Sequence, residues 1–275
     1  MLGVAILLGA TTVVQFATDR LSCRLKDADP ERSMARFVGY PNGAKDDHFV
    51  PNTNAWFHGI DFSCASPWNS GGGALRAGTL ISRRHVVFAK HFPLWKGVRI
   101  VFVDAAGAVC PCYIEATKAV SDTDIMLGLL NAEVTPNIRP ARILPEDYEK
   151  HIGHGEGLSV ITFNQHEQGV LGDLQPIYVS PVNSGMGAQA PKDVNRVRFS
   201  RRLIGGDSGN PAFILIGNEA VLAYCLKGGG GGCAQAIHYY RAVIQKTMDE
   251  LCPGYKLEAF DFSKLSLQAK RGSSK

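Results

Sequence analysis

The feature that most constrains this chain is a succession of short apolar runs, separated by glycine-containing turns, that begins near residue 71. Alternating and β-branched runs bounded by turn residues predict strands. The expected strands are 77–82, 85–89, 98–103, 108–116, 158–163, 175–180, 196–200, 212–216 and 221–226. A helical period is convincing only at 238–251, with an apolar stripe of Tyr239, Val243, Ile244, Met248 and Leu251. The sequence therefore predicts an all-β protein with a C-terminal helix.

Composition and charge exclude some classes of function. The 275 residues are 45% hydrophobic and 20% charged with a net charge of +4, which is ordinary for a globular chain. The basic residues of the tail, Lys270 and Arg271 with Lys275 beyond them, are typical of a solvated end. Nothing in this pattern calls for a nucleic-acid partner.

The cysteines do not predict a metal site. Seven is an odd number, so at least one thiol is unpaired within the chain, and no two Cys-x-x-Cys motifs are present. Cys110 and Cys112 would lie on one face of a strand, where two buried small apolar side chains are favoured over metal ligands. We expect no metal and no cofactor, and the redox compartment is left open.

Residues 203–211, Leu-Ile-Gly-Gly-Asp-Ser-Gly-Asn-Pro, place Ser208 on a turn framed by glycines. A serine hydroxyl is a poor nucleophile at neutral pH, so a catalytic serine needs a base and backbone donors around a developing oxyanion. Because Gly206 has no Cβ, its N–H can turn towards a substrate carbonyl beside the N–H of Ser208. The alternative is an ordinary turn between two strands, which these residue types also favour.

The segment 206–211, Gly-Asp-Ser-Gly-Asn-Pro, resembles the active-serine signature Gly-Asp-Ser-Gly-Gly-Pro of the chymotrypsin/trypsin-like serine peptidases, with Asn210 in place of one glycine. Residues 80–92 are similar to the strand of that family that ends in Thr-Ala-Ala-His-Cys. Matching alanine to alanine puts Ala89 two residues before the catalytic histidine, which selects His91 over His85. The resemblance covers roughly residues 54–251 and is thin outside its motifs.

The third member should be an acid that opens a buried strand and orients the imidazole. Residues 122–130 offer Asp122 and Asp124, and family members carry Asp-Ile-Ala-Leu here, so the resemblance implies Asp124. The order His91, Asp124, Ser208 is that of the chymotrypsin-like enzymes and not of the α/β-hydrolases. It implies a catalytic triad between two six-stranded antiparallel β-barrels of chymotrypsin type, at about 54–140 and 155–237, followed by the helix at 238–251.

The same resemblance implies a specificity pocket. Residues 221–228 match the strand that lines this pocket, which makes Leu226 and Gly228 substrate-binding candidates. The pocket-floor position, six residues before the serine, is Arg202, which suggests a preference for Asp or Glu before the cleaved bond. The alternative is that Arg201 and Arg202 face solvent on a loop. Phe92 and Ile204 stand where the family has cysteines, which indicates a divergent, bacterial-type member.

The first 53 residues have no counterpart in these motifs. Residues 1–17 carry no charged side chain, which suits an export signal, an uncleaved hydrophobic arm that would anchor the protein to a membrane, or a buried segment of the fold. Residues 18–53 are expected to be a polar arm or pro-region, with residues 36–39 as either an activation cleavage site or a surface loop. Residues 253–275 are expected to be a basic tail, and the protein to be a secreted or cell-envelope monomer.

These observations predict a serine endopeptidase domain over residues 54–252 that acts on a protein or peptide substrate. Two alternatives remain open. The same fold can serve as a catalytically silent binding module, and the same triad can act as an esterase or transacylase.

Overall fold

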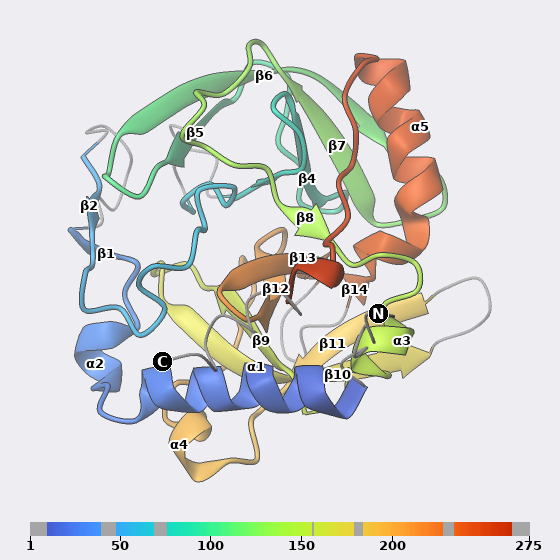
Figure 1. Ribbon diagram of the computed structural model, residues 1–275. Coiled ribbons are helices and arrows are strands. Elements are labelled where there is room, and N and C mark those ends of the chain that lie inside the picture. The colour runs from blue at the N-terminus through green and yellow to red at the C-terminus, as the bar shows by residue number, and fades with distance from the viewer. Residues whose placement is uncertain are drawn as a thin grey trace, which may run out of the picture.

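The structure, a computed structural model, describes residues 10–39, 48–68, 76–155, 157–178, 184–227 and 234–265. A five-stranded antiparallel sheet lies in the upper half of Figure 1. Its strands are β3 (Thr79–Leu80), β4 (His85–Ala89), β5 (Arg99–Val103), β6 (Val109–Ala119) and β7 (Ile125–Leu130), in the spatial order β3-β4-β7-β6-β5.

A seven-stranded sheet occupies the lower half of the same view. Its strands are β8 (Arg142–Ile143), β9 (Ser159–Phe163), β10 (Gly169–Tyr178), β11 (Ser184–Gln189), β12 (Pro211–Ile216), β13 (Glu219–Cys225) and β14 (Ala234–Gln235). Their spatial order is β14-β11-β10-β9-β12-β13-β8, and only β8 pairs in parallel. A separate small sheet pairs β1 (Phe37–Gly39) with β2 (Val50–Pro51).

The protein is therefore mostly β, as the sequence predicts. Alternation of side chains along β6 places Cys110, Cys112 and Ile114 in the core while the residues between them face solvent. The prediction of two six-stranded barrels is finer than these pairings support, because the described strands form sheets of five and seven. The six described cysteines are all free thiols, and Cys233 lies outside the described residues.

One predicted strand is wrong. Residues 196–200 were expected to be extended, but Arg196 and Val197 are the last two residues of the short helix α4 (Val194–Val197). Its start is defined by Asp193, whose carboxylate accepts the backbone N–H groups of Asn195 and Arg196. An Asp directly before the first helical residue is an N-cap signal, which the β-branched Val194 and Val197 obscured.

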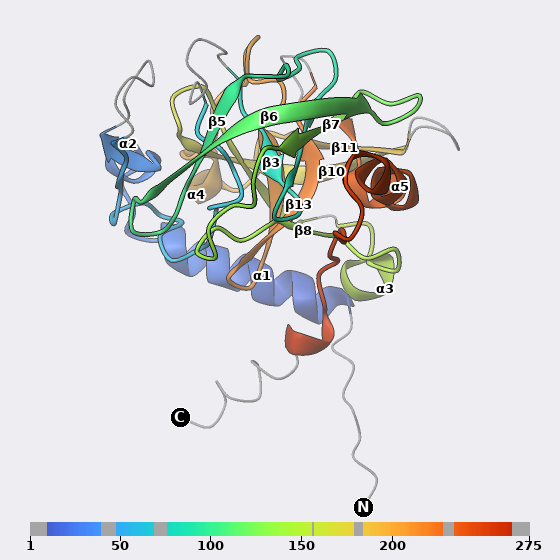
Figure 2. The same ribbon diagram turned by 90° about the horizontal axis from the view of Figure 1, so that it is seen from above.

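Of the alternatives for residues 1–17, the described part fits a buried segment of the fold, and residues 18–25 continue the same helix instead of forming a polar arm. Helix α1 (Ala10–Leu25) runs along the seven-stranded sheet in both Figure 1 and Figure 2. It buries Val13, Ala17, Leu21 and Leu25, which recur every four residues and so form one apolar stripe. Burying a Val or Leu side chain contributes about 1.5–3 kcal/mol, so this segment is part of the fold.

Helix α2 (Pro30–Ser33) follows α1, so the polar segment expected to be a pro-region is structured up to β1. No helix in the described part of the chain is both long and apolar enough to span a membrane. Residues 1–9, where an export signal would begin, lie outside the described residues.

The C-terminal boundary lies later than the sequence suggests. The predicted helix is split into a 3-10 turn (Ile237–Tyr240) and α5 (Arg241–Leu251), which buries Ile244 and Met248. Beyond it, Leu257 and Phe260 are buried, and Ala259 forms a bridge to Ile143. Residues up to 265 therefore belong to the fold, while the basic run at 270–275 lies outside the described residues.

Candidate active site

Strand pairing brings two of the predicted residues together. Strands β4 and β7 are antiparallel neighbours in which Ala89 is opposite Ile125. The chain leaves β4 just before His91 and enters β7 just after Asp124, so both residues lie at the same edge of the five-stranded sheet. Ser208 comes from the other sheet, on the turn that leads into β12.

The three side chains form one hydrogen-bonded chain. His91 Nδ1 lies 2.6 Å from Asp124 Oδ2, and His91 Nε2 lies 2.9 Å from Ser208 Oγ. The other carboxylate oxygen, Asp124 Oδ1, accepts the backbone N–H of His91 at 2.9 Å. With the proton on Nδ1 held by the carboxylate, Nε2 can accept the serine proton. The Asp124 side chain is 12% exposed and that of His91 41% exposed, which leaves the imidazole open to a substrate.

The alternative candidates for the base and the acid, His85 and Asp122, lie outside this hydrogen-bonded chain. His85 is fully buried at the start of β4, and its Nδ1 is 2.8 Å from Ser82 Oγ. Burial lowers the pKa of His85 to about 4. Asp122 has a φ of 53°, in a turn before β7. The structure thus joins His91 and Asp124 to Ser208 and leaves both rivals outside that arrangement.

The serine turn depends on glycine at two positions. Gly206 and Gly209 have φ angles of +100° and +87°, which side chains rarely adopt. A Cβ on Gly206 would also lie only 2.6 Å from Gln165 Nε2. Position 206 therefore admits no side chain unless Gln165 moves.

Asp207 fixes the same turn from behind. Its carboxylate accepts the N–H of Ile204 at 2.7 Å and the N–H of Gln165 at 3.0 Å. Burial raises the pKa of Asp207, and these backbone donors oppose the increase. The partners of Asp207 are therefore backbone N–H groups of the same chain.

This arrangement bears on the segment at residues 36–39, where the sequence suggested a cleavage site or a surface loop. Neither description fits. Arg36 is only 8% exposed, and Phe37–Gly39 form β1. The Arg36 guanidinium lies 3.3 Å from the buried carboxylate of Glu167 and donates to the carbonyl of Phe62. A protease would have to unfold this segment to reach the bond after Arg36.

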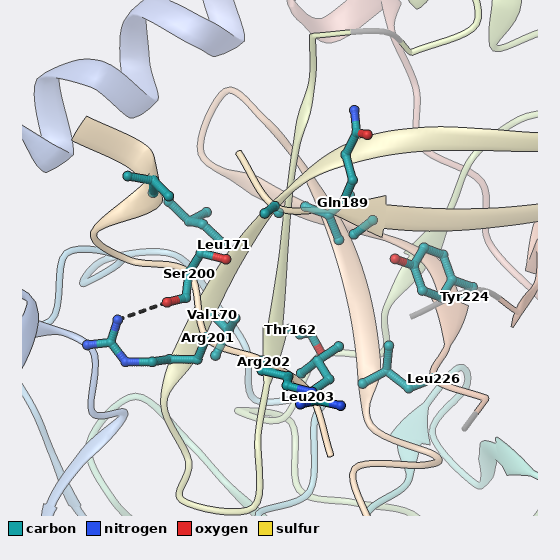
Figure 3. Close-up of a pocket in the computed structure, with 15 residues that line it drawn as sticks. Thr162, Val170, Leu171, Gln189, Ser200, Arg201, Arg202, Leu203, Tyr224 and Leu226 are labelled. Carbon is teal, nitrogen blue, oxygen red and sulfur yellow. Dashed lines mark hydrogen bonds between the residues drawn. The ribbon is translucent and has the colours of Figure 1, made fainter. Parts of the chain in front are cut away.

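A cavity of about 410 Å³ lies beside the serine turn (Figure 3). Most of its wall is apolar, with Val160, Val170, Leu171, Leu203, Tyr224 and Leu226 among the lining residues. Leu226 connects the cavity to the turn, because its carbonyl accepts the N–H of Gly209 and its N–H donates to the carbonyl of Asn210.

Arg201 and Arg202 both line this cavity. Arg201 donates to the carbonyl of Ser200, the contact drawn in Figure 3. The exposed Arg202 makes no ion pair with a carboxylate among the described residues. Arg202 and Leu226 thus line one cavity, and Arg201 and Arg202 are also exposed on a loop, as the alternative interpretation has them. Gly228 lies outside the described residues.

Sequence reasoning missed three residues around the turn. Gln165 contacts it directly, Trp68 Nε1 donates to the carbonyl of Gly206 at 3.1 Å, and Glu167 accepts the N–H of Trp68 at 2.6 Å. None belongs to a motif, and no local pattern in the sequence could have assigned them.

Within the described part of the chain, no group of three or more His, Cys, Asp or Glu side chains is placed to hold a metal ion.

No model of a known protein family matches the chain, and the search of curated protein sequences found no significant match.

Proposed function

We propose that this protein is a serine endopeptidase of the chymotrypsin-like type, with its site between two barrel-like halves. The observation that carries the proposal is the unbroken hydrogen-bonded chain from Asp124 through His91 to Ser208. Three side chains from two sheets, separated by 33 and 84 residues in the sequence, meet in the order and geometry that acyl transfer requires.

In the first step His91 Nε2 takes the proton of Ser208 as Oγ attacks the scissile carbonyl carbon. The C–O bond forms while the carbonyl π-electrons move to oxygen. The N–H groups of Gly206 and Ser208 stabilise this oxyanion, and the carboxylate of Asp124 stabilises the imidazolium. Collapse breaks the C–N bond, and His91 returns the proton to the leaving amine.

In the second step a water molecule replaces the amine. His91 removes a proton from this water as the water oxygen attacks the carbonyl carbon of the acyl-enzyme ester. Collapse of the resulting intermediate breaks the bond to Ser208 Oγ, and His91 returns the proton to this oxygen. The products are a carboxylic acid and the free serine. An ester would pass through the same steps, so esterase activity is expected beside peptidase activity.

The pocket supports a proposal about the residue that precedes the cleaved bond. The apolar wall suits an extended side chain, and the guanidinium of Arg202 offers a charge partner for a carboxylate at its end. We therefore propose that the protein prefers substrates with Glu or Asp before the cleaved bond.

The experiment that tests the enzyme proposal is intact-mass analysis after exposure to a fluorophosphonate. We expect one adduct on the wild type and none on Ser208→Ala or His91→Ala. With a peptide substrate, Ser208→Ala should lose about three to six orders of magnitude in rate.

An unlabelled wild type that is folded by circular dichroism would contradict the peptidase proposal. It would favour the silent binding module instead. Labelling of Ser208→Ala at the wild-type rate would place the nucleophile elsewhere in the chain.

A further inference from the structure

The peptide bond between Gly205 and Gly206 carries the Gly206 N–H, and its carbonyl, that of Gly205, is held by a side chain. Gln165 Nε2 donates to the carbonyl of Gly205 at 2.8 Å. No described peptide bond is cis, and in a trans peptide the C=O and the N–H point in opposite directions. Because the Gly205 carbonyl points at Gln165, the N–H of Gly206 points away from it.

The contact is close as well as directional. The position of a Cβ on Gly206 would be 2.6 Å from the same Nε2 atom. Gln165 therefore lies directly against the turn, and rotation of the Gly205–Gly206 peptide would break its hydrogen bond. Glycines have an unusually flat conformational landscape, so two in succession need an external contact to select one orientation.

Gln165 is itself held in place. Its backbone N–H donates to Asp207 Oδ1 at 3.0 Å, and it lies in the turn between β9 and β10. In this turn Asn164 Oδ1 accepts the N–H groups of His166 and Gln168. The backbone that carries Gln165 is thus fixed at both ends of the turn.

A buried ion pair anchors this turn to the N-terminal segment. Glu167, with a φ of 54°, is 2% exposed and pairs with Arg36, whose own N–H donates to the Glu167 carbonyl at 2.8 Å. The second carboxylate oxygen accepts the N–H of Trp68, and the Trp68 indole donates to the Gly206 carbonyl. The carbonyl of Gly205 is therefore held by Gln165, and the carbonyl of Gly206 by Trp68.

We propose that Gln165 is a positioning residue that aims the Gly206 N–H at the oxyanion, and that it does so in the intact chain without a newly cut N-terminus. This inference rests on the peptidase function proposed above. The contacts of Gln165 are with the backbone of the serine turn, through the Gly205 carbonyl, and with the carboxylate of Asp207. Its effect therefore passes through the serine turn and not through His91.

The test is the rate of fluorophosphonate labelling, measured as a function of pH on the full chain. Gln165→Met keeps the length of the side chain but removes the N–H donor. The plateau rate should fall about 10- to 100-fold, somewhat less than the loss of an oxyanion donor itself. The midpoint of the pH profile should not move.

Gln175→Met is the matched control, because Gln175 is an exposed residue of β10 and lines none of the cavities of the site. It should label at the wild-type rate. If Gln165→Met does not fold, Gln165→Glu keeps the shape, cannot donate when ionised, and should show the same loss of plateau.

The outcomes separate the two proposals. A wild type that is not labelled overturns the peptidase function and this inference with it. A labelled wild type with Gln165→Met and Gln165→Glu at the same plateau rate overturns the inference alone. A displaced midpoint with an unchanged plateau also overturns it, because Gln165 would then act on the triad.

Discussion

Replacing Arg36 with methionine tests the anchor of the N-terminal segment most directly. The substitution keeps the length of the aliphatic stem but removes the guanidinium that lies 3.3 Å from Glu167. The Glu167 carboxylate, 2% exposed, then stays buried with the N–H of Trp68 as its remaining donor in this network.

The magnitude follows from that burial. Removing one partner of a buried ion pair costs about 3–5 kcal/mol, because the other charge is left uncompensated. We expect about 3 kcal/mol for Arg36→Met, near the lower end, since Trp68 still donates to the carboxylate. The double variant Arg36→Met with Glu167→Gln should recover part of this loss, because a neutral amide oxygen can accept the same N–H.

The loss should depend on pH in a defined direction. Burial raises the pKa of Glu167, and Arg36 opposes the increase, so removing Arg36 should raise this pKa further. An acid whose pKa is higher in the folded state binds more protons there, and the free energy of unfolding falls as pH rises through that pKa. The deficit of Arg36→Met relative to the wild type should therefore be larger at pH 8 than at pH 5.

The assay is urea denaturation followed by tryptophan fluorescence at both pH values, analysed with a common slope against denaturant. The reasoning is refuted if Arg36→Met is within about 1 kcal/mol of the wild type at pH 8, well below the cost of breaking a buried pair. It is also refuted if the double variant is no more stable than the single one.

Two further predictions concern specificity and acid stability. In a peptide library that varies the residue before the cleaved bond, Arg202→Ala should lose the preference for Glu over Leu that we expect of the wild type; an unchanged ratio would show that Arg202 does not read the substrate. Burial lowers the pKa of both His85 and His238 to about 4, below the usual 6.5. Because the unfolded chain then binds more protons, stability should fall as pH drops from about 6.5 towards 4. Urea midpoints of His238→Gln should fall less steeply over this range, and parallel curves for variant and wild type would contradict the assignment.

Much of the strand pattern could be predicted because it is a local property. The run at 85–89 is the strand β4 residue for residue, since β-branched and aromatic residues bounded by turn residues favour one conformation. The helix near 238–251 was predicted from its apolar period, although its first turn is 3-10. The segment at 196–200 was misassigned because the cap at Asp193 outweighed its β-branched content.

The N-terminal region shows where local patterns fail. By composition an uncharged stretch suits an export signal, an uncleaved anchor or a buried segment of the fold. Only the packing of Val13 and Ala17, followed by Leu21 and Leu25, into the core decides for residues 10–25. Likewise the sequence around Arg36 resembles a cleavage site, because nothing near it reveals a carboxylate 131 residues away.

By itself the sequence determined which residues could form a triad, because His91, Asp124 and Ser208 each stand in a short motif with its own spacing and order. Only the tertiary structure brought these three into hydrogen-bond contact and placed Gln165, Trp68 and Glu167 behind the serine turn. The physical reason is that strand and turn preferences act between neighbours in the chain, whereas the orientation of the Gly205–Gly206 peptide depends on side chains that the fold brings from distant segments.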